Sequence, residues 1–95
     1  MENSTKLVNK HYCYLVLCSD GSLYCGYTTD LQKRIHAHNN LKSGAKYTRS
    51  RRPVKLVYYE AFESKSMAMQ REYTIKQMPV SIKRKLITSH ATIQN

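Results

Sequence analysis

Acidic residues are scarce in this chain. It has 6 Asp+Glu against 16 Lys+Arg among 95 residues, which gives a formal net charge of +10 at pH 7. Glu2 is terminal, Asp20 belongs to a turn sequence, and Asp30 stands where a helix takes its N-cap oxygen, so these carboxylates have local structural roles. So few acids argue against a site for two metal ions. The carboxylates that remain for chemistry are Glu60, Glu63 and Glu72.

Long apolar runs and paired cysteine motifs are also missing. The longest uncharged apolar run, residues 12–18, is far shorter than the ~18 residues of a membrane-spanning helix, and no apolar secretion segment follows the basic N-terminus. The 3 cysteines, Cys13, Cys18 and Cys25, are odd in number and include no C-x-x-C pair, which rules out a full disulfide framework. We expect a soluble protein of the reducing cytoplasm that is not exported.

A chain of 95 residues is long enough for one domain and too short for two. Its 41% of hydrophobic residues suffices for a small core. We expect a frayed N-terminus over residues 1–10, a single domain over 11–88 and a polar tail over 89–95. A folded basic domain usually binds a polyanion, most commonly nucleic acid. A basic ribosome-associated or anionic-surface protein is the alternative.

Two expected strands, residues 12–18 and 22–28, flank Ser19-Asp20-Gly21 and predict a β-hairpin. A three-residue loop with Gly21 in the left-handed region places Tyr14 opposite Gly26 and Tyr24 on the same face. A two-residue turn would instead put Tyr14 and Tyr24 on opposite faces, and we favour the longer loop. One face then carries Tyr12, Tyr14, Val16, Tyr24 and Gly26, and a more apolar face carries Cys13, Leu15, Leu17, Leu23, Cys25 and Tyr27.

Helical patterns and one more strand fill the rest of the chain. Asp30 begins a helix that runs to about Asn40, and its stripe at helical spacing consists of Leu31, Arg34, Ile35 and His38. A basic loop covers 42–53 and a third strand covers 54–62. A second helix begins at Ser64 or Ser66 and ends before Pro79, and a short basic helix follows over 81–88. The order β-β-α-β-α-α predicts an α+β fold.

The order of several short motifs resembles that of the GIY-YIG nuclease superfamily, and most closely its small stand-alone group. These motifs are Tyr12-Cys13-Tyr14, Tyr24-Cys25-Gly26, Asp30-Leu31-x-x-Arg34 and a later helical Glu72. The resemblance covers about residues 12–87. It implies a three-stranded antiparallel sheet with flanking helices and a metal-dependent hydrolysis of phosphodiester bonds in DNA.

The resemblance also implies roles for individual residues. Tyr14 is the implied base or water-positioning group, and Tyr24 orients water and phosphate from the same face. Arg34 offers a planar, permanently charged group for a phosphate oxygen, and His38, one helical turn later, relays a proton. Gly26 opposite Tyr14 leaves room for the ring.

Glu72 lies on the inward stripe of its helix, where a carboxylate needs a cation beside it. It is therefore the candidate ligand of a single Mg²⁺ or Mn²⁺ ion, completed by water and substrate oxygens. The alternative is an ion pair with Arg34 or Arg71. Tyr14 and Tyr24 likewise have an alternative as ordinary aromatic residues of a sheet.

Basic residues and one tyrosine provide candidate contacts to nucleic acid. The stretch 83–87, where many active members of the family carry an asparagine, has none. A nucleic-acid-binding module of the same fold that does not cleave is therefore the rival interpretation. The candidate contact residues are Lys33, Lys42, Lys46, Tyr47, Arg49, Arg51, Arg52 and Lys76.

Overall fold

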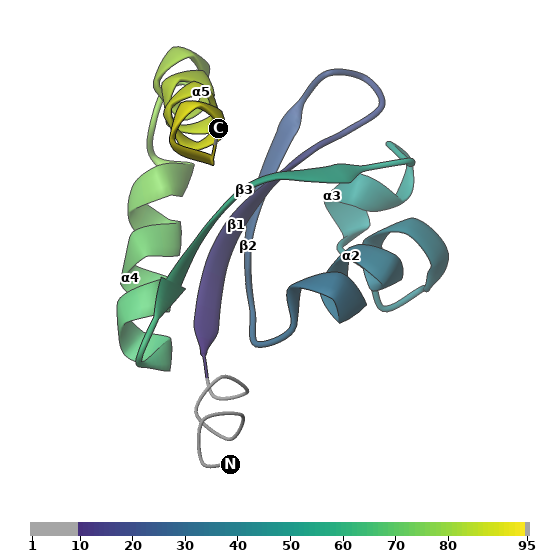
Figure 1. Ribbon diagram of the computed structural model, residues 1–95. Helices are drawn as coiled ribbons and strands as arrows, with labels where there is room; N and C mark the ends of the chain where they lie inside the picture. Colours follow the sequence, from purple (N-terminus) through teal and green to yellow (C-terminus); the bar gives the residue numbers. More distant parts are fainter. Residues whose placement is uncertain (1–9, 95) are drawn as a thin grey trace.

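The protein is built around a three-stranded antiparallel sheet (Figure 1). The computed structural model describes residues 10–94, with side chains described through Ser89, so all but the last residue of the expected frayed N-terminus lies outside the described residues. The strands are β1 (His11–Leu17), β2 (Leu23–Thr28) and β3 (Lys55–Phe62), in the order β2-β1-β3. The central strand is buried on both faces from Cys13 through Val16, because helices cover both sides of the sheet.

The hairpin between β1 and β2 has the three-residue loop that the sequence favoured. The Cys18 amide donates to the Ser22 carbonyl at 2.8 Å, and Gly21 has a φ of 87°. Such a positive φ is easily adopted by glycine. The resulting register pairs Tyr14 with Gly26 and Val16 with Tyr24, so Tyr14 and Tyr24 share a face as predicted.

One face of the sheet is covered by α2 (Leu31–Asn40) and α3 (Lys46–Arg49). The Asp30 side chain accepts a hydrogen bond from the Lys33 amide at 3.1 Å, which caps α2 as predicted. The short α3 lies inside the segment expected to be a basic loop, so that expectation is wrong over these residues. The core on this face contains Tyr14, Val16, Cys18 and Val54.

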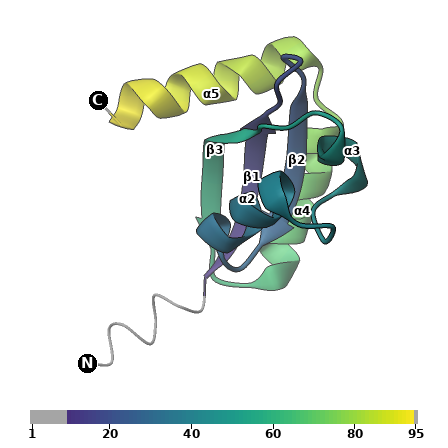
Figure 2. The same ribbon diagram turned by 90° about the vertical axis from the view of Figure 1, so that its right-hand side faces the viewer.

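The opposite face is covered by α4 (Lys65–Lys76) and α5 (Val80–Gln94). The Ser64 hydroxyl accepts a hydrogen bond from the Met67 amide at 3.2 Å, so Ser64 rather than Ser66 begins α4. The last helix runs well past the expected end at Thr88 and into the segment expected to be a polar tail. Figure 2 shows it crossing one end of the sheet and projecting beyond β3.

The core between the sheet, α4 and α5 is formed by Cys13, Leu15, Cys25, Tyr58 and Ile75. The three cysteines are buried free thiols, and the Sγ atoms of Cys13 and Cys25 lie 3.9 Å apart. Within the part of the chain that the structure describes, no helix is long and apolar enough to cross a membrane.

Candidate active site

Tyr14 is fully buried in the middle of β1, on the face covered by α2. Gly26 stands opposite it on β2. A Cβ atom at position 26 would lie 2.5 Å from the Tyr14 hydroxyl and 2.6 Å from Cζ of the ring, closer than any real Cβ contact. Gly26 therefore makes the space that the phenol occupies, as the sequence predicted.

Arg34 and His38 reach the Tyr14 hydroxyl from successive turns of α2. The hydroxyl lies 2.7 Å from Nε2 of His38, which is fully buried. Arg34 donates from Nε to the same hydroxyl at 3.4 Å and from Nη1 to the Ser43 carbonyl at 3.0 Å. The hairpin and the stripe of α2 thus bring together three of the predicted site residues in one hydrogen-bonded set.

The environment keeps both proton-bearing groups of this set neutral. Burial raises the pKa of Tyr14 to about 12, although the hydrogen bond and charge of Arg34 act in the opposite direction. Burial and the positive charges of Arg34 and Arg52 lower the pKa of His38 to about 4. At neutral pH the pair is therefore a phenol beside an uncharged imidazole, which can accept a proton.

Tyr24 forms the side of the site at the β2 edge. Its ring meets that of His38 edge to face, with the ring centroids 5.4 Å apart, and stacks on Tyr47 at 5.9 Å. The guanidinium of Arg51 lies 3.9 Å from the Tyr47 ring centroid and pairs with Asp20 of the hairpin loop at 3.0 Å. Tyr47 and Arg51, both predicted to contact nucleic acid, are thus already ordered against the site.

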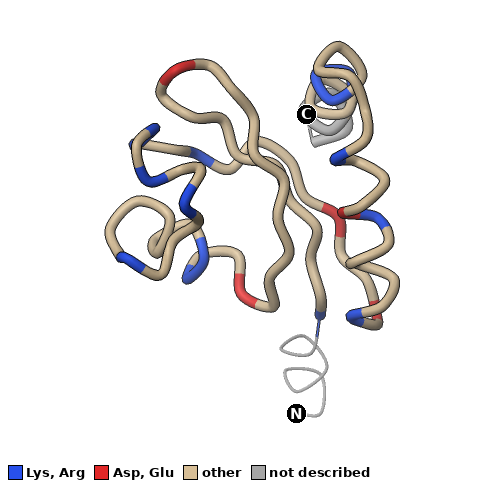
Figure 3. The backbone as a smooth tube through the Cα atoms, turned by 180° about the vertical axis from the view of Figure 1, so that it is seen from behind, with Lys and Arg blue, Asp and Glu red and all other residues tan. Residues whose placement is uncertain are grey.

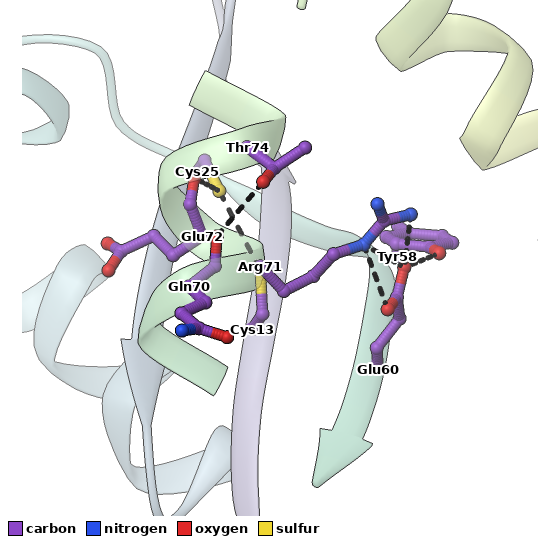
Figure 4. Close-up of polar contacts among 8 residues, drawn as sticks. All are labelled: Cys13, Cys25, Tyr58, Glu60, Gln70, Arg71, Glu72 and Thr74. Carbon is purple, nitrogen blue, oxygen red and sulfur yellow. Dashed lines mark hydrogen bonds and ion pairs between the residues drawn. The ribbon is translucent and has the colours of Figure 1, made fainter. Parts of the chain in front are cut away.

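Glu72 lies on α4, across the sheet from Tyr14 and α2. Its carboxylate pairs with Lys76 at 3.2 Å, and its side chain is 14% exposed. Arg71 pairs instead with Glu60 at 3.1 Å, and Figure 4 shows the Arg71 and Glu72 side chains leaving α4 in different directions. The expected alternative of an ion pair between Glu72 and Arg34 or Arg71 is therefore wrong, because Lys76 is the partner.

Glu72 lies beside β2, which is an edge strand of the sheet. The Cys25 thiol donates to the Glu72 carbonyl at 3.9 Å and so joins β2 to α4 (Figure 4). Burial alone would lower the pKa of Lys76, but the hydrogen bond and charge of Glu72 raise it above its usual value, with a smaller contribution from Tyr24.

The donor set limits which metal fits. Among the described residues, no group of three or more His, Cys, Asp or Glu side chains is placed to hold an ion. A lone carboxylate such as that of Glu72 fits Mg²⁺ or Mn²⁺, since Mg²⁺ commonly keeps several waters and takes further oxygens from a phosphate. It does not fit a zinc centre built from protein ligands.

Some of the predicted nucleic-acid-binding residues are exposed to solvent, and others form hydrogen bonds or ion pairs within the protein. Lys33, Lys42 and Lys46 are exposed, and Lys33 lines an open groove of about 360 Å³ beside Arg34. Arg52 instead donates to the His38 carbonyl at 2.5 Å and to the Leu41 carbonyl at 2.6 Å. Its guanidinium holds the C-terminal end of α2, a role that the sequence interpretation missed.

Sequence reasoning also missed Thr48 and Ser43. Thr48 is fully buried, and its Oγ1 lies 2.8 Å from Nδ1 of His38. Both residues belong to the segment interpreted as a basic loop, whose charge pattern gives no sign of a buried threonine. The only available signal was the adjacency of this segment to the end of the helix that carries Arg34 and His38.

Several known proteins are similar to this chain in sequence and in fold. A UPF0213 protein of Staphylococcus saprophyticus is 57% identical over 81 residues, which are 85% of this chain and 98% of the relative. The solution NMR structure of a UPF0213 protein of Bacillus halodurans has 47% identity and a TM-score of 0.54, over 83% of each chain. That of a protein from E. faecalis has 41% identity and a TM-score of 0.58, over 84% of each chain.

The same α+β fold is therefore present in solved structures of similar sequence, as the motif order predicted. The family described as the GIY-YIG catalytic domain matches residues 10–84, a range that includes all three strands and the five predicted site residues. The chain belongs to the GIY-YIG family.

Proposed function

We propose that this protein is a small divalent-metal-dependent endonuclease that hydrolyses phosphodiester bonds in DNA. Membership of a family with a catalytic domain of this type supports a nuclease-like activity. The observation that carries the proposal is the hydrogen-bonded set of Arg34, Tyr14 and His38 beside an open groove. This set combines a phosphate-binding cation with a phenol and an imidazole that share one proton.

The proton of the attacking water moves through Tyr14. Tyr14 is fully buried in the substrate-free structure, so in the proposed step Arg34 shifts from the Tyr14 oxygen to the phosphate and admits the attacking water. The Tyr14 oxygen then takes a proton from that water while its own proton passes to Nε2 of His38, 2.7 Å away. No free tyrosinate forms, which suits a phenol whose pKa is raised to about 12. The imidazole is the final acceptor, and the water oxygen is left with the electron pair that attacks phosphorus.

Substrate binding strengthens this base. Arg34 is one of two arginines whose charge lowers the pKa of His38. A phosphodiester oxygen on the Arg34 guanidinium neutralises that charge, so the pKa of His38 rises when DNA occupies the groove. The site thereby becomes a better proton acceptor only when a phosphate is in place.

Glu72 would hold the metal beside β2, the strand that also carries Tyr24. The bound ion would stabilise the negative charge that develops on the leaving oxygen. Lys76 would give up its 3.2 Å pairing with Glu72 and become available to a phosphate of the same strand. Lys33, Lys42 and Lys46 would contact the backbone around the groove.

Cleavage of labelled single-stranded, duplex and branched DNA with Mg²⁺ or Mn²⁺, or with chelator, tests the proposal. The parent protein should cut at least one of these substrates only with metal, and Glu72→Gln should cut at least about 100-fold more slowly. Glu63→Gln is the matched control, since Glu63 is exposed and its one ion-pair partner among residues 10–94 is Lys10.

Binding without cleavage on every substrate would contradict the proposal and favour the non-cleaving module. Preference for structured RNA, with binding insensitive to Glu72→Gln, would favour the ribosome-associated alternative. Equal cleavage by Glu72→Gln and the parent would overturn the metal assignment.

A further inference from the structure

We propose that Thr48 is a positioning residue that holds His38 in the tautomer able to accept the Tyr14 proton. The inference rests on the proposed function for its consequence, because His38 is the proton acceptor there. Its geometric part, the position of one proton on the imidazole, stands independently of any activity.

Thr48 is placed to receive a hydrogen bond from His38 and to give one elsewhere. Its Oγ1 lies 2.8 Å from Nδ1 of His38 and donates to the Ala45 carbonyl at 3.0 Å. A hydroxyl has a single proton, so the bond to Ala45 leaves only the oxygen lone pairs for His38. Nδ1 therefore carries the imidazole proton, and Nε2 presents a lone pair to Tyr14.

The other end of the set requires the same assignment. Arg34 has no acceptor on its guanidinium, so its Nε can only donate to the Tyr14 oxygen. If Nε2 of His38 also donated to that oxygen, the buried Tyr14 proton would have no acceptor among the described residues. With the proton on Nδ1, each hydrogen bond from Arg34 Nε through Tyr14, His38 and Thr48 to Ala45 joins one donor to one acceptor, as expected of buried polar groups.

Thr48 lies close to α2 because the backbone at Gly44, just before α3, packs directly against the backbone of α2. A Cβ atom on Gly44 would lie 2.6 Å from the Ala37 carbonyl oxygen and 2.9 Å from Cα of His38. Only a residue without a side chain allows this approach, which carries α3 and Thr48 to the imidazole. The buried position of Thr48, fully enclosed, then excludes water as a substitute partner.

The functional consequence is directional proton transfer. With Thr48 as acceptor at Nδ1, the chain of donors runs from Arg34 through Tyr14 to His38. Without the Thr48 oxygen, the imidazole is free to place its proton on Nε2. That tautomer donates to Tyr14 and cannot take its proton.

Long-range ¹H–¹⁵N correlation spectra of the ¹⁵N-histidine-labelled full chain at neutral pH test the geometric part. The parent should show His38 with a protonated Nδ1 and an unprotonated Nε2. Thr48→Val removes the hydroxyl at nearly constant shape and should shift His38 to the Nε2-protonated or averaged pattern, whereas Thr48→Ser should restore the parent pattern. A parent with the proton on Nε2 would overturn the inference, and this measurement needs no variant to fold.

Single-turnover cleavage tests the functional part. Thr48→Val should cleave DNA at least about 10-fold more slowly than the parent, with the DNA dissociation constant unchanged, and Thr48→Ser should recover most of that loss. Thr74→Val is the matched control, since the exposed Thr74 hydroxyl also donates to a carbonyl of its own helix.

The failures of the two proposals are distinguishable. A parent that never cleaves, but shows the Nδ1-protonated His38, defeats the nuclease proposal and leaves the positioning role of Thr48 in place. A Thr48→Val variant with the altered tautomer and the parent's cleavage rate defeats the role of Thr48 and leaves the nuclease proposal in place.

Discussion

Tyr14 and His38 form a buried polar pair in an otherwise apolar layer between the sheet and α2. A phenol and an imidazole at this depth are stable only because each has a hydrogen-bond partner on both sides. The partners are Arg34 for the phenol, and Thr48 for the far nitrogen of the imidazole. The pair is therefore fixed in position in the substrate-free structure, which is what the proposed proton relay requires.

The depressed pKa of His38 predicts a specific pH dependence of stability. Burial first, then Arg34 and Arg52, lower its pKa to about 4 in the folded protein, against about 6.5 in the unfolded chain. The unfolded chain therefore binds the proton first as pH falls, so the free energy of unfolding declines between about pH 6.5 and 4. At about 1.4 kcal/mol per pKa unit the loss is about 3 kcal/mol.

Urea unfolding across this pH range, with an NMR titration of the His38 ring, measures the effect. The ring should titrate near the low end of the range. A His38 ring that titrates at or above the ordinary histidine pKa, in the folded protein, would contradict the account of its environment.

Helix α2 positions the site because both of its ends are fixed. Asp30 caps its first turn, and Arg52 donates to carbonyls of its last turn. Uncompensated carbonyls at a helix C-terminus carry partial negative charge, so a guanidinium there is stabilising. Arg34 and His38 lie between these two anchors.

The role of Arg52 predicts a structural phenotype for a charge-preserving substitution. Arg52→Lys keeps the charge but loses the planar group that reaches several carbonyls at once, so we expect the free energy of unfolding to fall by about 2 kcal/mol. Arg49→Lys is the control, since Arg49 is exposed and donates to a single carbonyl, that of Lys42. Equal stability of Arg52→Lys and the parent in urea unfolding would contradict this role.

The elements that sequence predicted are those with local signals. The loop Ser19-Asp20-Gly21 set the register that brings Tyr14 opposite Gly26, and Asp30 marked the start of α2 through its capping side chain. For α4 the sequence offered two candidate caps, Ser64 and Ser66, of which Ser64 is the one used. Three of the predicted site residues, Tyr14, Arg34 and His38, come together because the β1–β2 hairpin and α2, both predicted from local signals, pack against each other.

What sequence could not predict depends on tertiary contacts. The basic segment after α2 contains the short helix α3, the buried Thr48 and Arg52, which donates to carbonyls of α2. No periodic pattern of apolar residues in this segment indicates any of the three. In the sequence, an arginine that donates to helix carbonyls cannot be distinguished from one that is free to bind a phosphate. The spacing of Glu72 and Lys76, four residues apart on a helix, allows an ion pair between them. The same sequence equally allows Glu72 to bind a metal ion, so the sequence did not decide between the two.

At the scale of the whole molecule, positive charge lies on both sides of the sheet. Figure 3 shows basic residues along the segment from α2 to β3 and, separately, along α4 and α5. Only the first group borders the groove beside Arg34. Under the proposed function the net charge of +10 would attract DNA generally, while the first group, of which Lys33 and Arg34 line the groove, would determine where the backbone lies.

This division predicts a change in the salt dependence of DNA binding. Removing the exposed Lys42 and Lys46 together, by substitution to alanine, should lower the slope of log affinity against log salt by about 2 for duplex DNA. The control is Lys65→Ala, at the start of α4 on the opposite face, which should change the slope little. Fluorescence anisotropy over a salt series measures both, and an unchanged slope in the double variant would contradict the assigned surface.

The central claim is that Tyr14 passes the proton of the attacking water to His38. The most direct test is the single-turnover cleavage rate of Tyr14→Phe on the DNA that the parent cuts best, with Tyr73→Phe, an exposed tyrosine, as control. The account predicts a rate at least about 100-fold below that of the parent, with DNA affinity retained. Cleavage by Tyr14→Phe at the parent's rate would contradict it.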